Sequence, residues 1–218
     1  MKKTILATLL FSLSFTACRK ETTTENMPQA DTLVTTPVAK DVNTAVKGEL
    51  TQLVRKTMGW TALKDNFTLL PTTEKDSVYT GFDLAKHADN LKILKDSGFF
   101  SKGFIDNYDN IIKELNRKIQ SKEFATWNVG DLQPFSFAND ADPWCNCQDD
   151  PAEFNTPLNV GIISLDDNSG KFFYYYGDKE SDANGYSYKF NAVKENGTWK
   201  ISYMEGFDYG QSIKPDGE

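Results

Sequence analysis

The stretch KFFYYYG at residues 171–177 and the stretch YSYKFNAVKENGTWKISYMEGF at residues 186–207 decide the fold. Apolar and aromatic side chains alternate with polar ones in both, which is the period of a strand with one buried face. Asn196-Gly197 interrupts the second stretch and predicts a tight hairpin, because both residues accept positive φ. Antiparallel strands are expected at 134–138, 159–166, 171–177, 186–194 and 198–207.

The residues before this region have the period of helices. Apolar residues recur there at three- and four-residue spacing, which is typical of amphipathic helices. The three predicted helical segments are 43–58, 82–98 and 101–119. Helices followed by an antiparallel meander predict an α+β domain, with N-terminal helices packed on a curved antiparallel sheet. We expect this domain to span residues 43–210 and to be followed by a C-terminal tail at 211–218.

Two short segments suggest a family. They are SGFFSKGFI at residues 97–105 and TWKI at residues 198–201. Together with the order of helices and strands, they resemble the nuclear-transport-factor-like, or cystatin-like, α+β cone superfamily, as in uncharacterised bacterial lipoproteins. The resemblance implies a cone whose open end often holds a small molecule, and members with enzymatic, binding or structural roles. It carries over no catalytic residue, because no family motif matches residue by residue.

Composition excludes several classes of protein. The chain has 218 residues, of which 39% are apolar and 13% aromatic, so wholesale disorder is excluded. Its 24 basic and 31 acidic residues give a net charge of −7, which argues against a nucleic-acid partner. A single histidine excludes multi-histidine metal centres, and no cofactor is expected.

The first residues resemble the signal peptide of a bacterial lipoprotein. Two lysines are followed by an uncharged run that is too short to span a membrane, as in a signal peptide. The run ends Phe15-Thr16-Ala17-Cys18, which resembles a lipobox with Cys18 as the lipidated residue. The alternative is a plain secretory signal with an incidental cysteine.

A lipidated Cys18 would make residues 1–17 a cleaved signal peptide and residues 18–42 a lipidated cysteine with a flexible tether, since that segment is rich in Thr, Pro and charge. Loss of Lys2 and Lys3 leaves 22 basic against 31 acidic residues, a mature charge of −9. The membrane is then a partner through the lipid. Arg19 after the cysteine resembles outer-membrane lipoproteins, so the expected location is the bacterial cell envelope, at the outer membrane and facing the periplasm.

The alternation in the strands gathers aromatic side chains on one face. A tyrosine buries an apolar ring and offers a hydroxyl group, which suits a pocket for a ring-bearing or amphipathic ligand. The alternative is an ordinary aromatic core packed against the helices. The predicted ligand-binding residues are Tyr174, Tyr176, Tyr188, Trp199, Tyr203 and Glu205.

Glu205 is the one carboxylate in this apolar alternation, and it is a weak catalytic candidate. Burial among aromatic rings would raise its pKa, as proton transfer requires. Ketosteroid isomerase, which shares the cone fold, uses acidic residues in an apolar site in this way. The alternative is a glutamate at a strand end that reaches water. His87 is expected on a helix surface.

The segment 139–153 combines five acidic residues, two prolines and two cysteines. In an oxidising compartment Cys145 and Cys147 are the only thiols left once Cys18 is acylated, so a disulfide is expected, provided that a turn at Asn146 shortens their separation. Half of a soft-metal site and a redox role are the alternatives. Calcium is a weaker one, with candidate ligands at Asp140, Asp142, Asp149, Asp150 and Glu153.

Three functions remain open. The leading hypothesis is a non-catalytic extracytoplasmic lipoprotein that binds a small ligand or a partner through an aromatic-lined cone. The second is an isomerase or dehydratase-type enzyme that uses Glu205 with tyrosines. The third is an inhibitor or partner-binding protein that uses the acidic loop 139–153. A deep pocket would favour catalysis, whereas a filled sheet face would favour protein partnering.

Overall fold

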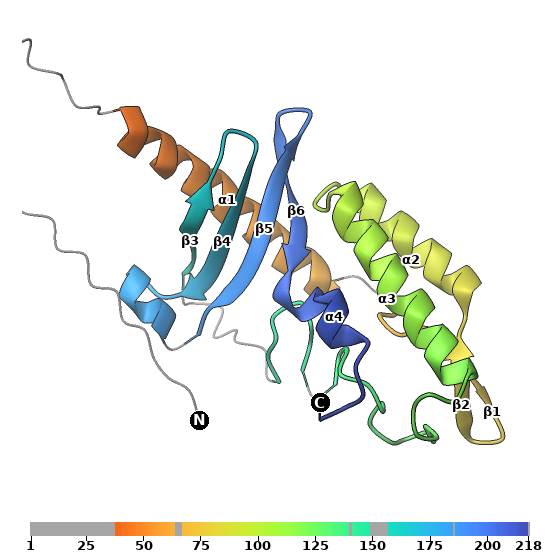
Figure 1. Ribbon diagram of the computed structural model, residues 1–218. Coiled ribbons are helices and arrows are strands. Elements are labelled where there is room, and N and C mark those ends of the chain that lie inside the picture. Colours follow the sequence, from red (N-terminus) through yellow and green to blue (C-terminus); the bar gives the residue numbers. More distant parts are fainter. Residues whose placement is uncertain (1–37, 64–66, 140, 149–156, 185, 218) are drawn as a thin grey trace, which may run out of the picture. The chain divides into compact units, whose positions relative to one another are not determined.

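The structure is a computed structural model that describes residues 38–63, 67–139, 141–148, 157–184 and 186–217. Residues 37–218 form one compact unit (Figure 1). The elements in chain order are α1 (Val38–Leu63), β1 (Thr72–Lys75), β2 (Val78–Phe82), α2 (Leu84–Ser97), α3 (Lys102–Gln120), β3 (Leu158–Leu165), β4 (Ser169–Tyr176), the 3₁₀ helix η1 (Glu180–Asn184), β5 (Tyr188–Glu195), β6 (Thr198–Met204), the 3₁₀ helix η2 (Glu205–Phe207) and α4 (Tyr209–Ser212). The predicted α+β class and antiparallel sheet are confirmed.

The helices begin and end where local chemistry favours it. The Asp83 side chain accepts hydrogen bonds from the first turn of α2, and Gly98 ends that helix with φ 74°, a left-handed conformation that costs glycine little. The Ser101 side chain caps α3 in the same way. The apolar stripe of α3, which the sequence predicts, is fully buried from Phe104 to Leu115, and Ile119 at its end is partly buried.

The main sheet has the order β3-β4-β5-β6, and every neighbouring pair is antiparallel. One face of this sheet carries most of its buried side chains and is called the inner face. Its members are Leu158, Val160, Ile162, Phe172, Tyr174, Tyr176, Tyr188, Phe190, Ala192, Trp199, Ile201 and Met204. The predicted alternation in residues 171–177 is confirmed, because Phe172 and Tyr174 are fully buried on this face.

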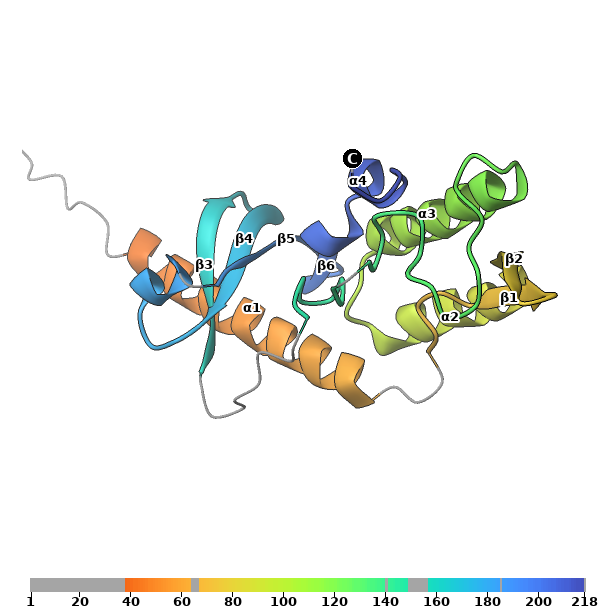
Figure 2. The ribbon, with the colours of Figure 1, turned by 90° about the horizontal axis from the view of Figure 1, so that it is seen from below.

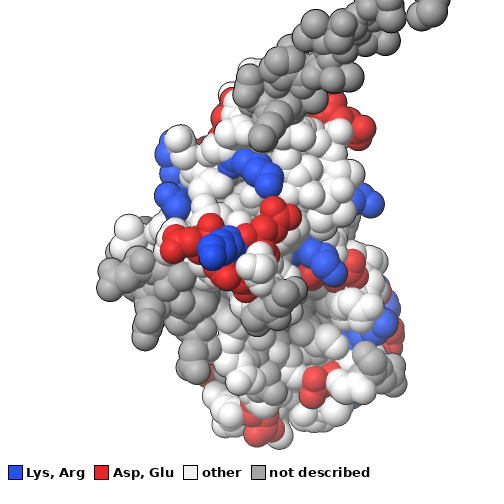
Figure 3. All heavy atoms as spheres, turned by 90° about the vertical axis from the view of Figure 1, so that its left-hand side faces the viewer, with Lys and Arg blue, Asp and Glu red and all other residues white. Residues whose placement is uncertain are grey.

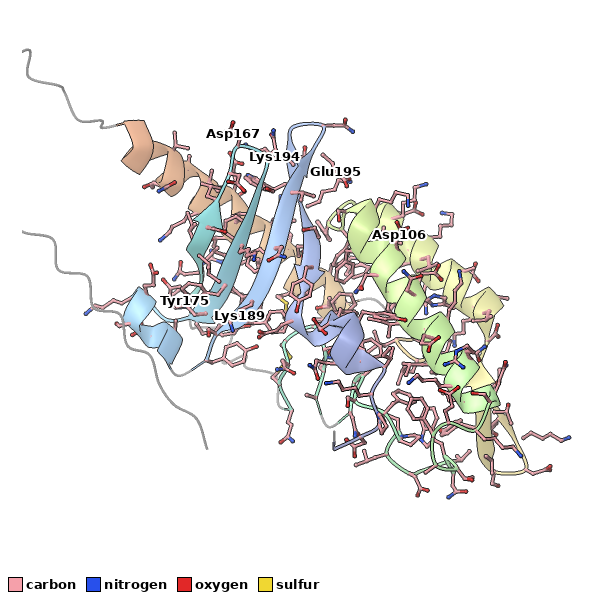
Figure 4. The ribbon with its side chains drawn as sticks, in the orientation of Figure 1. Asp106, Asp167, Tyr175, Lys189, Lys194 and Glu195 are labelled. Atoms are coloured by element: carbon pink, nitrogen blue, oxygen red, sulfur yellow. A yellow bond between two sulfur atoms is a disulfide. The ribbon has the colours of Figure 1, made fainter. Side chains whose placement is uncertain are left out.

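Helix α1 contacts β3 and β6, and Figures 1 and 2 both place it along one face of the main sheet. The Arg55 guanidinium of α1 donates to the Leu158 carbonyl at 2.7 Å, which ties the helix to the first strand. Helices α2 and α3 pack on each other, and α3 also contacts β2 and β6. At the β5–β6 hairpin Glu195 accepts a hydrogen bond from the Lys102 N–H at 3.3 Å, next to the start of α3 (Figure 4).

Several sequence predictions differ from the structure. Residues 134–138 form no strand; Phe135 and Phe137 are buried, but this alternation belongs to an irregular segment that makes one isolated bridge, Phe135 to Pro215. That bridge and the buried Ser212 also show that 211–218 is not a free tail over its described part.

Two further differences concern the first half of the chain. Strands β1 and β2 were not predicted, and Phe82 ends β2 although the sequence placed it in a helix. Helix α1 begins at Val38, five residues before the expected start of the domain at residue 43. Among the described helices, none is long and apolar enough to cross a membrane. The predicted signal peptide and Cys18 lie outside the described residues.

Candidate functional site

Three tyrosines at one end of the inner face bind a segment from elsewhere in the chain. Tyr174 and Tyr188 stack with ring centroids 5.0 Å apart, and neither side chain is exposed. Each of the three hydroxyl groups donates to a backbone carbonyl, and the three carbonyls are consecutive. The pairs are Tyr188 with Pro143 at 2.6 Å, Tyr174 with Trp144 at 3.2 Å, and Tyr186 with Cys145. Carbonyl groups that would otherwise be buried without a partner are thereby satisfied.

These carbonyls belong to a small closed loop formed by residues 142–147, which we call loop 142–147. Its ends are joined by a hydrogen bond from the Asp142 N–H to the Cys147 carbonyl at 2.9 Å. A disulfide links Cys145 to Cys147, with their Cα atoms 5.2 Å apart. Asn146 lies between them with φ 53°, which is the turn that the short separation requires. Covalent closure and the tyrosine contacts together fix the conformation of the loop.

The end of β6 completes the contact with loop 142–147. The Gly206 N–H donates to the Tyr188 hydroxyl at 2.9 Å, so this hydroxyl both donates and accepts. A Cβ atom at Gly206 would overlap the carbonyl oxygen of Pro143 and lie 2.7 Å from its Cα. Only a residue without a side chain therefore permits this approach of the two backbones.

Burial controls the chemistry of the three hydroxyl groups. It raises the pKa of Tyr174 and of Tyr188 well above the ordinary value of a phenol. Burial raises the pKa of Tyr186 to about 12. All three therefore stay protonated at neutral pH, and the structure uses them as hydrogen-bond donors to the loop.

Trp144 anchors loop 142–147 in the centre of an aromatic cluster. Its side chain is 3% exposed and contacts rings from several elements. Centroid distances from Trp144 are 4.5 Å to Phe207, 5.5 Å to Phe100, 6.1 Å to Phe67, 6.1 Å to Phe104 and 6.2 Å to Trp60. The loop thus occupies the space between the sheet and the helices, which the sequence left as either a ligand cup or a filled core.

The structure brings only part of the predicted ligand-binding set together. Tyr176 joins the tyrosines, since its ring lies 6.3 Å from Tyr174 and 6.0 Å from Tyr186. Trp199 of β6 lies opposite Lys194 of β5. Lys194 is six residues from Tyr188 along β5, so Trp199 lies about 20 Å from the tyrosines at the rise of a strand. It packs against Phe172 at 6.0 Å and is part of the core at the other end of the sheet.

Tyr203 does not face the same side of the sheet as Trp199, which corrects the sequence prediction. The register between β5 and β6 shifts after Asn191. Asn191 pairs with Tyr203, whereas Ala192, the next residue of β5, pairs with Ile201. Ser202 is left over as a β-bulge, and a bulge transfers the following residues to opposite faces. Tyr203 donates instead to the Asp208 carboxylate at 3.2 Å.

Glu205 also departs from its predicted position. Strand β6 ends at Met204, and Glu205 begins the 3₁₀ helix η2 rather than continuing the strand. It is half-buried, and burial raises the pKa of its carboxyl group, although a hydrogen bond from the Lys189 N–H opposes this rise. The carboxylate therefore pairs with the backbone at the start of β5, and the tyrosine hydroxyl groups are already bonded to the loop.

The proposed metal ligands do not assemble within the described residues. Asp142 uses one oxygen to accept from the Trp144 N–H at 3.0 Å, which stabilises the loop. No group of three or more His, Cys, Asp or Glu side chains in the described part of the chain has the arrangement of a metal site. The other candidates, Asp140, Asp149, Asp150 and Glu153, lie outside it.

His87 is buried, contrary to the sequence expectation of a surface residue. Its Nε2 lies 3.1 Å from the Asp109 carboxylate of α3, and its ring packs 5.1 Å from that of Tyr108. Burial lowers the pKa of His87 and outweighs the opposing effect of Asp109. The burial of His87 could have been predicted from its spacing to Asn90 and Leu94, because residues three and four positions apart share a helix face and all three are buried in α2.

An open hollow adjoins loop 142–147. It has a volume of about 470 Å³ and is lined by Phe67, Leu69, Ala138, Ala141, Asp142, Pro143 and Trp144. Nothing in the sequence indicated it, since its two walls come from segments about seventy residues apart in the chain.

No family model, no curated protein and no solved structure matches this chain. Its function therefore has to be inferred from the contacts of its own residues.

Proposed function

We propose that this chain is a non-catalytic, lipid-anchored protein of the bacterial cell envelope that binds a protein partner through loop 142–147 and the hollow beside it. The observation that carries the proposal is the set of three tyrosine hydroxyl groups bonded to three consecutive carbonyls of a disulfide-closed loop. A loop that is already ordered loses little conformational entropy on binding, which is a common property of recognition surfaces.

The state of the inner face favours a protein partner over a small ligand in the cone. Tyr174 and Tyr188 have no exposed surface, so a ligand that contacted their rings would first have to displace the loop. Displacement would leave three buried carbonyls and the Trp144 ring without their contacts. Asn146 of the loop and Gln148 next to it are exposed and are accessible without this cost.

The same contacts disfavour the isomerase or dehydratase hypothesis. A general acid or base must reach the reacting group within hydrogen-bond distance. The hydroxyl groups of Tyr174, Tyr186 and Tyr188 are bonded to the loop, that of Tyr203 donates to Asp208, and Glu205 accepts from a backbone N–H. We also propose, from the order of one long helix, a helix pair and a four-stranded antiparallel sheet, that this chain belongs to the cone superfamily.

The lipid anchor is proposed from residues 1–18. Replacement Cys18→Ala should abolish labelling by radioactive palmitate and release the protein from membrane fractions of the native cells. Retention in the membrane fraction with unchanged labelling would refute the anchor. A variant of a neighbouring residue, Arg19→Ala, is the control, since it keeps the thiol.

Partner binding is tested in intact cells with a photo-crosslinking amino acid. Placed at Gln148, an exposed residue next to the loop, it should yield one reproducible protein adduct that mass spectrometry can identify. The same amino acid at Lys75, an exposed residue of the β1–β2 hairpin, should not yield that adduct. No adduct at Gln148, or the same adduct at both positions, would contradict a partner at this loop.

A further inference from the structure

The hollow beside loop 142–147 has the size of a site for one large side chain. Phe67 and Leu69 form one wall, and the segment 138–144 contributes the other wall through its described residues. Its volume of about 470 Å³ lies within the usual range of ligand pockets, roughly 300–1,000 Å³. Because it is open to the surface, a side chain that projects from another protein can enter it.

Except for that of Asp142, the described side chains that line this hollow are apolar, and contacts hold both walls in place. The Phe67 ring packs 6.1 Å from the Trp144 ring, and the Leu69 carbonyl accepts from the Tyr108 hydroxyl at 2.7 Å. On the other wall Pro143 and Trp144 are held by the tyrosines of the sheet. A preformed apolar hollow favours an apolar occupant, because burial gains free energy and little of the wall has to be ordered.

Among the described residues that line the hollow, Asp142 is the charged one. One carboxylate oxygen accepts from the Trp144 N–H at 3.0 Å, which fixes the position of this exposed side chain. Among the described residues, no Lys, Arg or His forms an ion pair with Asp142. A fixed carboxylate without a basic partner attracts a cation from another molecule.

The stretch of sequence that contains Asp142 has no basic residue. Residues 124–170 contain eight acidic residues and no Lys, Arg or His. Other parts of the surface differ, since basic and acidic side chains lie next to one another on the side that Figure 3 shows. Pairs such as Lys47–Glu180 at 3.2 Å and Arg117–Glu123 at 2.6 Å neutralise each other. Residues 124–170 are therefore acidic in sequence, and Asp142 has no basic neighbour along the chain within this stretch.

We infer that the hollow receives an aromatic or leucine side chain of a partner protein, and that a Lys or Arg next to this side chain pairs with Asp142. The occupant is thus an exposed basic peptide segment with an apolar residue at its centre. This inference rests on the proposed function, since it names the partner chemistry for the same loop. Apolar burial supplies most of the affinity, while the charge pair fixes register and speeds association.

The test uses a random-peptide display library selected on the full-length protein. Selected peptides should combine Phe, Tyr, Trp or Leu with a neighbouring Lys or Arg. Asp142→Asn removes the charge but keeps an oxygen for the Trp144 N–H, so it should weaken a selected synthetic peptide by about two- to fivefold at low salt. Asp76→Asn, at an exposed residue of the β1–β2 hairpin with φ 52°, should leave the affinity unchanged.

A second variant addresses the apolar wall. Leu69→Gln should abolish detectable binding of the same peptide, while thermal unfolding reports whether the variant is folded. Peptides without basic residues, or peptides that bind wild type and Asp142→Asn equally, would overturn the inference and leave the proposed function intact. Failure to select any peptide, although a Gln148 adduct forms in cells, would also overturn it. Failure of both experiments would refute the proposed function itself.

Discussion

Replacement of Tyr188 by phenylalanine removes one oxygen atom from the centre of the contact between the sheet and loop 142–147. The hydroxyl group donates to the Pro143 carbonyl at 2.6 Å and accepts from the Gly206 N–H at 2.9 Å, and the side chain is fully buried. Both backbone groups lose their partner, and water cannot reach them without rearrangement. An unsatisfied buried group costs about 1–3 kcal/mol, so the loss of two predicts about 2–6 kcal/mol.

Two matched variants calibrate this value. Tyr174→Phe removes the bond to the Trp144 carbonyl at 3.2 Å, together with a hydrogen bond between the Tyr174 and Tyr186 hydroxyl groups. It leaves one buried carbonyl without a partner and should cost about 1–3 kcal/mol. Tyr175, labelled in Figure 4, lies on the opposite face of the same strand, and the structure records no hydroxyl hydrogen bond for it within the described residues. Tyr175→Phe should therefore change stability by no more than about 0.5 kcal/mol.

Urea unfolding followed by tryptophan fluorescence measures all three, because Trp144 lies inside the contact. At a slope of about 2 kcal/mol per molar urea, Tyr188→Phe should lower the midpoint by about 1–3 M with an unchanged slope. Equal midpoints for Tyr188→Phe and Tyr175→Phe would refute the argument that the loop is held by these hydroxyl groups.

Three other features of the same region are open to direct measurement. Gly206→Ala should destabilise the fold by about 2–4 kcal/mol, because the added methyl group meets the backbone of Pro143. The control Gly103→Ala, in the first turn of α3, should be neutral or slightly stabilising. Equal effects of the two variants in urea unfolding would contradict the close approach of Gly206 to Pro143. The non-reduced peptide that contains Cys145 and Cys147 should be two hydrogen atoms lighter than its reduced form, and alkylation of both thiols without a reductant would exclude the disulfide. Glu205 has a raised pKa in the fold, so its contribution to stability is complete below its unfolded pKa and is lost as the pH rises through its folded pKa. The Glu205→Gln variant should therefore gain stability relative to wild type from about pH 4 upward. A stability difference that does not vary with pH would contradict the burial of this carboxyl group.

Local pattern was sufficient for most elements of the main sheet and for two helices. The ends of β3, β4 and β5 agree with the predicted strands within about two residues, because strand alternation and the turns between strands depend on neighbours in sequence. The cap at Ser101 and the stripe along α3 are local in the same sense. Strands β1 and β2 were not predicted, since both are short and β1 is mostly exposed, so that little apolar alternation is left to detect.

The candidate site was predicted only in part, for the same physical reason. Tyr174, Tyr176 and Tyr188 were identified as a group because they share a face, which is a property of alternation. Tyr203 was assigned to that face wrongly, since the bulge at Ser202 depends on how β6 pairs with β5 and leaves no mark in the sequence of β6 alone.

The sequence by itself determined the α+β class, the hairpin at Asn196-Gly197, the closeness of Cys145 and Cys147, and the acidic character of residues 124–170. Only the tertiary structure decided what occupies the aromatic face. The hydrogen bonds from Tyr174 and Tyr188 to loop 142–147 join residues 30 and 45 positions apart. Such contacts depend on the packing of whole elements, and no periodicity within a single element specifies them.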